Sequence, residues 1–330
     1  MLIKKLTFIL LLLLLSAGLL ACPSEEPIPP PDLPERLPII EEVEVTTVRI
    51  YYVTTDQQYL VPLHLSITAT RDVATVALEL LLAGPPNSLV GSVIPADTKL
   101  LDLYSIGNII YVNLTQEFMD VTYENARLAV ESILCTILPL AEGRTLQILV
   151  EGRIIDRLGS VDISAPLALP FVNISATDRA LLADGYSGMI LTYYLSDELA
   201  HFLVPQTMLY LPEVASAVPS TEAQARAVLE RLLQSQSEDS NLWNPFNTDT
   251  ELLGIHLRDE VIYVDFSAEL FASGGTLSEA IIPDILLYTL CGLPGITAVQ
   301  ILVEGQEAYT PHGLDLSQPL SPDAPVNSIF

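Results

Sequence analysis

Basic side chains are scarce in this sequence. Its 330 residues include 14 lysines and arginines against 41 aspartates and glutamates, which gives a net charge of −27. Affinity for nucleic acid comes largely from lysine and arginine contacts to phosphate, so this composition argues against a nucleic-acid partner. It also argues against a protein that lies flat on anionic lipid. We interpret the acidity mainly as a source of solubility, and leave open a role in binding cations or a basic partner.

The residues that usually carry catalysis are also few and scattered. The four histidines show no His-Glu-x-x-His or paired Cys/His spacing, so we predict no metal site. Only 16 glycines are present, and none forms a phosphate-binding loop. Gly185-Tyr186-Ser187-Gly188 lacks the Gly-x-Ser-x-Gly spacing of a serine nucleophile and is better explained as a turn between domains. We therefore predict that the protein is not an enzyme, with no catalytic residue and no bound cofactor.

Long apolar runs are absent except at the N-terminus. Lys4 and Lys5 precede an apolar run from Leu6 to Ala21, in the order of a secretory signal. The run is shorter than the roughly 20 residues of a spanning helix, although an uncleaved anchor remains the alternative. It ends in Leu19-Leu20-Ala21-Cys22, which resembles the lipobox of bacterial lipoproteins. That resemblance implies a signal peptide over residues 1–21, a diacylglycerol and fatty acyl group on Cys22, and attachment to the extracytoplasmic face of the cell membrane.

Prolines are concentrated directly after this cysteine. Residues 22–47 carry seven prolines among acidic residues and little that could pack into a core. A proline-rich chain prefers an extended form of about 3.1 Å per residue. We predict a tether that holds the folded part away from the lipid.

Cysteine is rare, with only Cys135 and Cys291 beyond Cys22. Each lies in an apolar and predicted helical stretch, at a similar place in two separate repeats. We interpret them as two buried thiols, one in each core. In an exported protein a disulfide between them is the alternative.

What the sequence does contain is an internal repeat. Its clearest matches, in chain order, are Tyr59-Leu60-Val61-Pro62 with Phe202-Leu203-Val204-Pro205, Ile110–Leu114 with Ile262–Phe266, and Gln147–Gly152 with Gln300–Gly305. The offset between copies grows after the first match, which places an insertion near residues 206–220. Two domain-sized copies indicate duplication of a folded module rather than a solenoid.

Each copy shows the pattern of an α/β module. In the first, strands over 48–53 and 60–67 precede a helix over 72–83, a strand over 109–114, a helix over 123–138 and a strand over 148–150. In the second, Thr221 to Gln224 resembles a capping box at a helix start, and Pro283 predicts a kink or a late start of the last helix. We predict an α/β (α+β) fold of two tandem two-layer domains, with helices on one face of a mixed sheet.

These motifs resemble those of GerMN domains, the sporulation and spore germination module of bacterial envelope proteins. The resemblance rests on Leu81-Leu82-Ala83-Gly84-Pro85, on Ile94-Pro95 with Thr98, on the Tyr-Val-Asn/Asp strand and on Val-Glu-Gly. The second copy departs from it at Gln234-Ser235 and at Pro245-Phe246-Asn247. The resemblance implies a non-enzymatic role in assembling envelope or sporulation complexes, with other envelope proteins as partners and a possible homo-oligomer.

We assign the domain boundaries from the repeat. Domain 1 covers residues 48–168, a linker covers 169–188, domain 2 covers 189–320, and residues 321–330 form a C-terminal tail.

Two sets of residues are candidate sites. Glu151 and Glu304 of the Val-Glu-Gly motif are repeated, with Asp162 and Asp315 a fixed distance beyond each. They could form a repeated polar site, or be solvated acids at strand ends before a glycine turn.

Trp243 and Phe246 lie in a polar loop and are candidate partner contacts, unless that loop folds back and buries the indole. From this loop and the insertion we expect the second domain to carry the specific contact. The alternatives to an adaptor are a peptidoglycan-associated hydrolase or its accessory, and a protein that binds a small ligand or cation.

Overall fold

A computed structural model describes most of the chain after residue 43. The described residues are 44–141, 143–175, 178–179, 189–196, 202–209, 220–234, 242–272, 275–322 and 325–329. Residues 44–330 form one compact unit. The predicted signal peptide, Cys22 and most of the proline-rich tether lie outside the described residues. So do the predicted interdomain turn at 185–188 and positions 210–219 of the predicted insertion.

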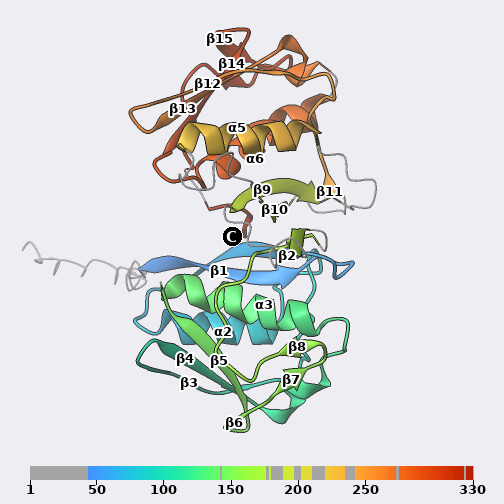
Figure 1. Ribbon diagram of the computed structural model, residues 1–330, viewed down its shortest axis with the longest axis vertical. Coiled ribbons are helices and arrows are strands. Elements are labelled where there is room, and N and C mark those ends of the chain that lie inside the picture. Colours follow the sequence, from blue (N-terminus) through green and yellow to red (C-terminus); the bar gives the residue numbers. More distant parts are fainter. Residues whose placement is uncertain are drawn as a thin grey trace, which may run out of the picture. The chain divides into compact units, whose positions relative to one another are not determined.

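The first module contains the elements that the sequence predicts, with shifted ends (Figure 1). They are β1 (Val45–Val53), β2 (Leu60–Thr68), α2 (Val73–Ala83), β3 (Leu100–Ile106), β4 (Ile109–Leu114), η1 (Gln116–Asp120), α3 (Ala126–Ile137), η2 (Leu138–Leu140), β5 (Thr145–Val150), β6 (Arg153–Ile154), β7 (Arg157–Leu158) and β8 (Val161–Asp162).

The second module repeats this order. Its elements are β9 (Met189–Ser196), β10 (Leu203–Leu209), α5 (Thr221–Gln234), β11 (Leu242–Trp243), β12 (Leu252–Arg258), β13 (Val261–Phe266), η4 (Ala268–Phe271), α6 (Gly275–Leu290), β14 (Ala298–Val303), β15 (Gln306–Tyr309) and β16 (Asp315–Leu316). A last short strand, β17 (Ser328–Ile329), lies in the segment that we assigned to a tail.

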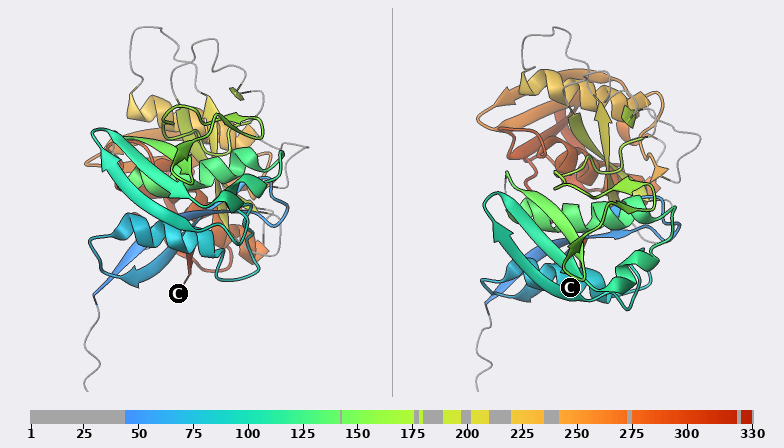
Figure 2. Two further views of the ribbon diagram at one scale, coloured as in Figure 1. Left: turned by 90° about the horizontal axis from the view of Figure 1, so that it is seen from below. Right: turned by 60° about the horizontal axis from the view of Figure 1, so that its bottom comes forward.

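The α/β fold class is confirmed. The strands of each module form two main sheets, and β7 and β8 of the first module form a third, two-stranded sheet. In the first module, β1 and β2 form an antiparallel hairpin, while β3-β4-β5-β6 form a mixed sheet in which β4 and β5 run parallel. Figure 1 shows α2 and α3 between the hairpin and this sheet. Figure 2 shows from two further directions that β3 and β4 run together as an antiparallel hairpin. The helices therefore contact strands on both sides, where we expected a single sheet.

The second module has the same topology around its parallel pair. Strands β12-β13-β14-β15-β16 form one sheet with β13 and β14 parallel, and β10-β9-β11 form the other. The predicted central strands, β5 and β14, each have neighbours on both sides. Each module has one large core cluster, and a smaller third cluster around Leu60, Leu128 and Val172 lies in the first module.

Burial explains why these segments form helices. In α3 every residue except Arg127 is buried, because the helix lies between two sheets and carries apolar side chains on most of its surface. Among the described residues, no helix is long and apolar enough to cross a bilayer.

Two predicted details of helix ends are corrected. The cap of α5 is Ser220, whose hydroxyl oxygen accepts a hydrogen bond from Ala223 N, whereas the Thr221 hydroxyl donates to Pro294 O. Helix α6 begins at Gly275 and runs through Pro283 to Leu290, so Pro283 does not delay its start. A buried position, at which packing offsets the missing amide hydrogen bond, accounts for this tolerance.

Candidate functional site

The repeated Glu-Gly pair forms the tight turn of a hairpin in both modules. Glu151 and Gly152 have φ angles of 50° and 73°, and Glu304 and Gly305 have 51° and 74°. Two consecutive residues with positive φ between paired strands are the pattern of a type I′ turn. The motif is thus explained by backbone geometry, since glycine adopts this region without strain.

The polar residue of the Tyr-Val-Asn/Asp strand holds this turn. Gly152 N donates to Asn113 Oδ1 at 2.8 Å, and Gly305 N donates to Asp265 Oδ1 at the same distance. The exposed Glu151 also accepts a hydrogen bond from Gln116 N through Oε1. Two motifs that are separate in the sequence therefore form one structural unit.

Asp162 ends β8 and Asp315 begins β16, outside the turns that contain the glutamates. Both are exposed, and each accepts a hydrogen bond from the backbone amide two residues ahead, Ser164 N or Ser317 N. Hydrogen bonds from these serines lower the pKa of both aspartates. Each acid thus has a local turn role, and the proposed repeated polar site gains no support from this geometry.

The aromatic candidates of the second module do not form an exposed pair. Trp243 lies in β11, pairs with Leu195 of β9 and is half-buried against the second core. Phe246 is a core residue with 5 % of its surface exposed. Phe246 is therefore corrected from a partner contact to a packing residue, and only part of the Trp243 side chain is open to a partner.

The two cysteines of the modules are free. Cys135 is buried as predicted, and burial raises its thiol pKa far above the ordinary value. Cys291 is only half-buried, which corrects the expectation of two fully buried thiols.

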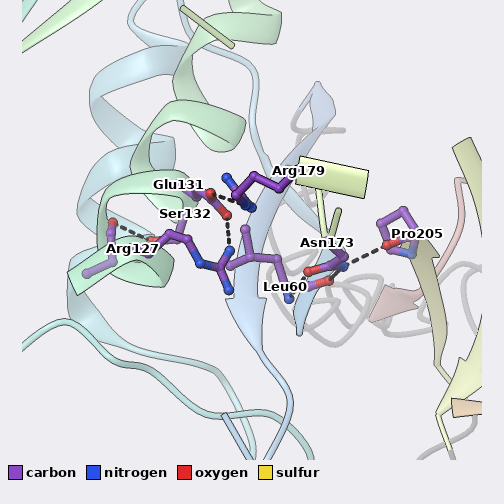
Figure 3. A network of polar contacts seen from close by, with 8 residues as sticks. Leu60, Arg127, Glu131, Ser132, Asn173, Arg179 and Pro205 are labelled. Atoms are coloured by element: carbon purple, nitrogen blue, oxygen red, sulfur yellow. Dashed lines mark hydrogen bonds and ion pairs between the residues drawn. The ribbon is translucent and has the colours of Figure 1, made fainter. Parts of the chain in front are cut away.

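The buried acids, Glu131 and Glu279, each contact a basic side chain. Glu131 of α3 contacts Arg127 Nη1 at 2.7 Å and Arg179 Nη2 at 3.5 Å (Figure 3). Glu279 of α6 accepts from His312 N and contacts His312 Nδ1 at 2.7 Å. Within the described part of the chain, no cluster of three or more His, Cys, Asp or Glu residues could hold a metal ion.

An exposed apolar surface lies on the sheet of the first module. In β4, Ile110, Val112 and Leu114 face the core, so Ile109, Tyr111 and Asn113 face outward. The paired residues Tyr104 and Ile106 of β3 share this outward face, as does Ile154 of β6 through its pairing with Leu149. We name Tyr104, Ile106, Tyr111 and Ile154 the outer sheet face.

The side chains of this face are well exposed for their size. Ile106 is 63 % exposed, Ile154 56 % and Tyr104 39 %. The Tyr104 and Tyr111 rings stack with centroids 5.1 Å apart. Exposed apolar side chains such as Ile106 and the stacked tyrosines are typical of an interaction site, whereas Ile154 lies across the sheet from them, beside the buried Leu149.

A protein-family model described as Sporulation and spore germination (Germane) matches residues 49–156 and 192–309. The chain belongs to this family. The two matched segments are the two modules of the structure, which are therefore tandem Germane domains.

GerM of Bacillus subtilis resembles this chain both in sequence and in solved structure. Spore germination protein GerM of Bacillus subtilis (strain 168) is 23 % identical over 302 residues, which cover 87 % of this chain and 80 % of that protein. The solved structure of the tandem GerMN domains of the sporulation protein GerM from Bacillus subtilis superimposes with a TM-score of 0.63 at 18 % identity. It covers 86 % of this chain and 99 % of that one, which confirms the fold.

The two Germane domains differ at the outer sheet face. His256 and Arg258 of β12 pair with β13 as Tyr104 and Ile106 of β3 pair with β4. Glu307 of β15 pairs with Leu302 as Ile154 pairs with Leu149. The same three positions are thus apolar in the first domain and polar or charged in the second.

The outer sheet face was not predicted from the sequence, although the sequence contains a signal for it. The internal repeat points to positions that the two copies share, whereas this face lies at positions where they differ. Alignment of the copies places Tyr104 against His256 and Ile106 against Arg258. The differences between the repeats therefore indicate this surface better than their identities do.

Proposed function

We propose that this protein is a lipid-anchored, non-enzymatic adaptor of the cell envelope that acts in sporulation or germination. Cys22 carries the lipid, residues 23–44 act as the spacer before β1, and the two Germane domains bind other envelope or sporulation proteins on the extracytoplasmic side. Membership in a sporulation and germination family supports the biological setting. The lipobox-like sequence before Cys22 supports the anchor.

The observation that carries the adaptor role is the difference between the two outer sheet faces. A solvated sheet face normally carries polar side chains, and the second domain has His256, Arg258 and Glu307 at the three matched positions, with the exposed Tyr309 beside them on β15. Isoleucine and tyrosine at the matching positions of the first domain leave apolar area in water. Burial of such area against a partner is favourable by roughly 25 cal/mol per Å². We therefore place the main partner contact on the first domain rather than on the Trp243 loop.

The test replaces the first face with residues of the second. The variant Ile106→Arg with Ile154→Glu introduces side chains that the same fold carries at the same positions of the second domain. We expect it to fold and to lose the envelope proteins that crosslink to the wild-type chain in intact cells. The control changes the second face by Arg258→Gln with Glu307→Gln and should keep them.

Two results would contradict the adaptor proposal. One is an unchanged crosslinking pattern for the Ile106→Arg/Ile154→Glu variant. The other is clearing of a peptidoglycan gel by the purified wild-type protein, which would indicate hydrolase activity.

The anchor is tested separately. Cys22→Ala removes the thiol that accepts the lipid, so we expect loss of fatty-acid labelling and a shift from the membrane fraction to the soluble fraction. Cys135→Ala is the control, because that thiol lies in the core. Continued fatty-acid labelling of the Cys22→Ala variant would rule out this anchor.

A further inference from the structure

Two asparagines occupy equivalent places at the ends of the two domains. Asn173 follows the buried Val172, and Asn327 follows the buried Val326. Each valine packs with residues of its own domain, Val172 beside Leu128 and Val326 in the second core. Both asparagines have positive φ, at 52° and 54°, a conformation that asparagine tolerates better than most residues.

The first asparagine bonds to both domains (Figure 3). Asn173 Oδ1 accepts from Leu60 N at 2.8 Å, and Asn173 Nδ2 donates to Leu60 O at 2.8 Å. The same Nδ2 donates to Pro205 O of the second domain at 2.7 Å. The amide thus fixes one residue of its own domain and reaches a carbonyl of the other.

The second asparagine makes the same three bonds with the domains exchanged. Asn327 Oδ1 accepts from Leu203 N at 2.9 Å, and Asn327 Nδ2 donates to Leu203 O at 2.8 Å. Its Nδ2 also donates to Pro62 O of the first domain at 2.9 Å. Leu60 and Pro62 belong to the repeated Leu-Val-Pro motif, as do Leu203 and Pro205.

The backbone beside each asparagine also bonds to the other domain, through Val172 O in one case and Asn327 O in the other. Thr207 N of β10 donates to Val172 O at 2.9 Å, and His64 N of β2 donates to Asn327 O at 3.2 Å. Strand β17 then pairs in parallel with β2, Ser328 opposite His64. Each domain therefore places the segment that follows its sheet on the second strand of the other domain.

We infer that Asn173 and Asn327 form a reciprocal pair of clasps that couples the two Germane domains, with the C-terminal segment as an integral part of the first domain's sheet. Exchange of equivalent contacts defines an isologous interface, here formed within one chain. Its apolar centre includes Val204 of the second domain, which is fully buried and packs in the first core. The repeated Leu-Val-Pro motif supplies the backbone groups that each clasp binds. This inference does not depend on the adaptor role.

The chemistry of the amide explains why asparagine is required. The side chain offers one acceptor and two N–H donors, and both clasps use an acceptor bond and two donor bonds. Aspartate keeps the acceptor bond from Leu60 N or Leu203 N but loses both donor bonds, one to the carbonyl of that same leucine and one to the carbonyl of the other domain. Effects of an Asn→Asp variant in the other domain therefore report the lost bridge, whereas effects at the leucine report the lost local bond.

The experiment is hydrogen exchange on the full chain, read at single amides. In Asn173→Asp we expect the Thr207 amide, which lies in the other domain, to exchange at least about tenfold faster, because one lost hydrogen bond is worth roughly that factor. In Asn327→Asp we expect the same at His64. Amides of Val112 and Val264, in the two mixed sheets, should keep their rates in both variants. Ser328→Ala is the control, since that hydroxyl donates to the nearby Pro325 O and not, among the described residues, to the other domain.

Calorimetry gives an independent measurement. The wild-type chain should unfold in one transition, and the Asn173→Asp/Asn327→Asp variant in two, because its domains are uncoupled. The inference is overturned if each single variant speeds exchange only in its own domain, at Leu60 for Asn173 and at Leu203 for Asn327. It is also overturned if the double variant keeps one transition.

Discussion

The imidazole of His64 is held in one protonation state by its neighbours. Arg49 Nε donates to His64 Nε2 at 3.0 Å, so Nε2 carries no proton, and Nδ1 is bonded to Val326 O. Burial lowers the pKa of His64 below its ordinary value of 6.5, and the charge of Arg49 acts in the same direction, against the Val326 hydrogen bond. Because the unfolded chain then binds the proton more readily, this residue's contribution to stability is present above about pH 6.5 and falls as the pH drops below it.

We expect the urea midpoint of the wild type to fall more steeply between pH 7.5 and pH 5.5 than that of His64→Gln, which has no titrating group there. The control is His256→Gln, because His256 is exposed on β12. It should follow the wild-type curve. Parallel curves for the wild type and His64→Gln would show that His64 does not titrate with unfolding.

The ion pair of Glu131 is expected to respond differently to changes at its two ends. Burial raises the pKa of Glu131, and the charges and hydrogen bonds of Arg127 and Arg179 oppose that shift without cancelling it. Arg127→Ala leaves the buried carboxylate with less compensation, so we expect urea unfolding to show a loss of about 1–3 kcal/mol at pH 7. Glu131→Gln removes the buried charge and should cost less than Arg127→Ala.

Arg226→Ala, in the exposed pair with Glu230, should change stability by less than about 0.5 kcal/mol. Equal losses for both arginine variants would contradict this account.

At the scale of elements, the β7–β8 turn is constrained by both conformation and space. Gly159 has a φ of 54°, and a Cβ added there would lie 2.7 Å from Ala126 Cβ, at the start of α3. Gly159→Ala should therefore destabilise the chain by about 2–5 kcal/mol, as left-handed strain and overpacking add. Gly152→Ala is the matched control, since its φ is 73° with no atom within 4 Å of the added Cβ. It should cost only about 1–2 kcal/mol in urea unfolding. Similar costs for the two variants would show that space at Gly159 is not limiting.

Elements with a strong local pattern were predicted well from the sequence. The alternation of Ile109–Leu114 predicts β4, and the glycine after Ala83 predicts the end of α2. In each case one short segment contains the whole signal. The start of α5 at Thr221 was predicted, but its cap was misassigned by one residue, since Ser220 and Thr221 are both good caps and the Thr221 hydroxyl bonds to Pro294 O instead. The division of the strands into two sheets was missed, because it depends on which strands pair across the helices.

Candidate sites were harder to predict than elements because their roles depend on distant partners. Glu151 and Glu304 were identified by repetition, but the turn that explains them needs Asn113 and Asp265 from another strand. Asn173 was not predicted, since it lies in a segment with the composition of a linker and its partners are Leu60 and Pro205.

For the molecule as a whole, the excess of negative charge should determine how thermal stability responds to salt. With a net charge of −27, the compact state is opposed by self-repulsion, which dissolved ions screen over about 10 Å at 0.1 M. We expect the thermal midpoint to rise when NaCl is increased from 10 mM to 300 mM. Screening depends on ionic strength, so CaCl₂ at matched ionic strength should raise the midpoint by a similar amount.

Isothermal calorimetry with calcium should show no saturable heat. A much larger rise with calcium than with sodium, together with a saturable heat, would instead indicate a specific cation site and favour a cation-binding protein over an adaptor.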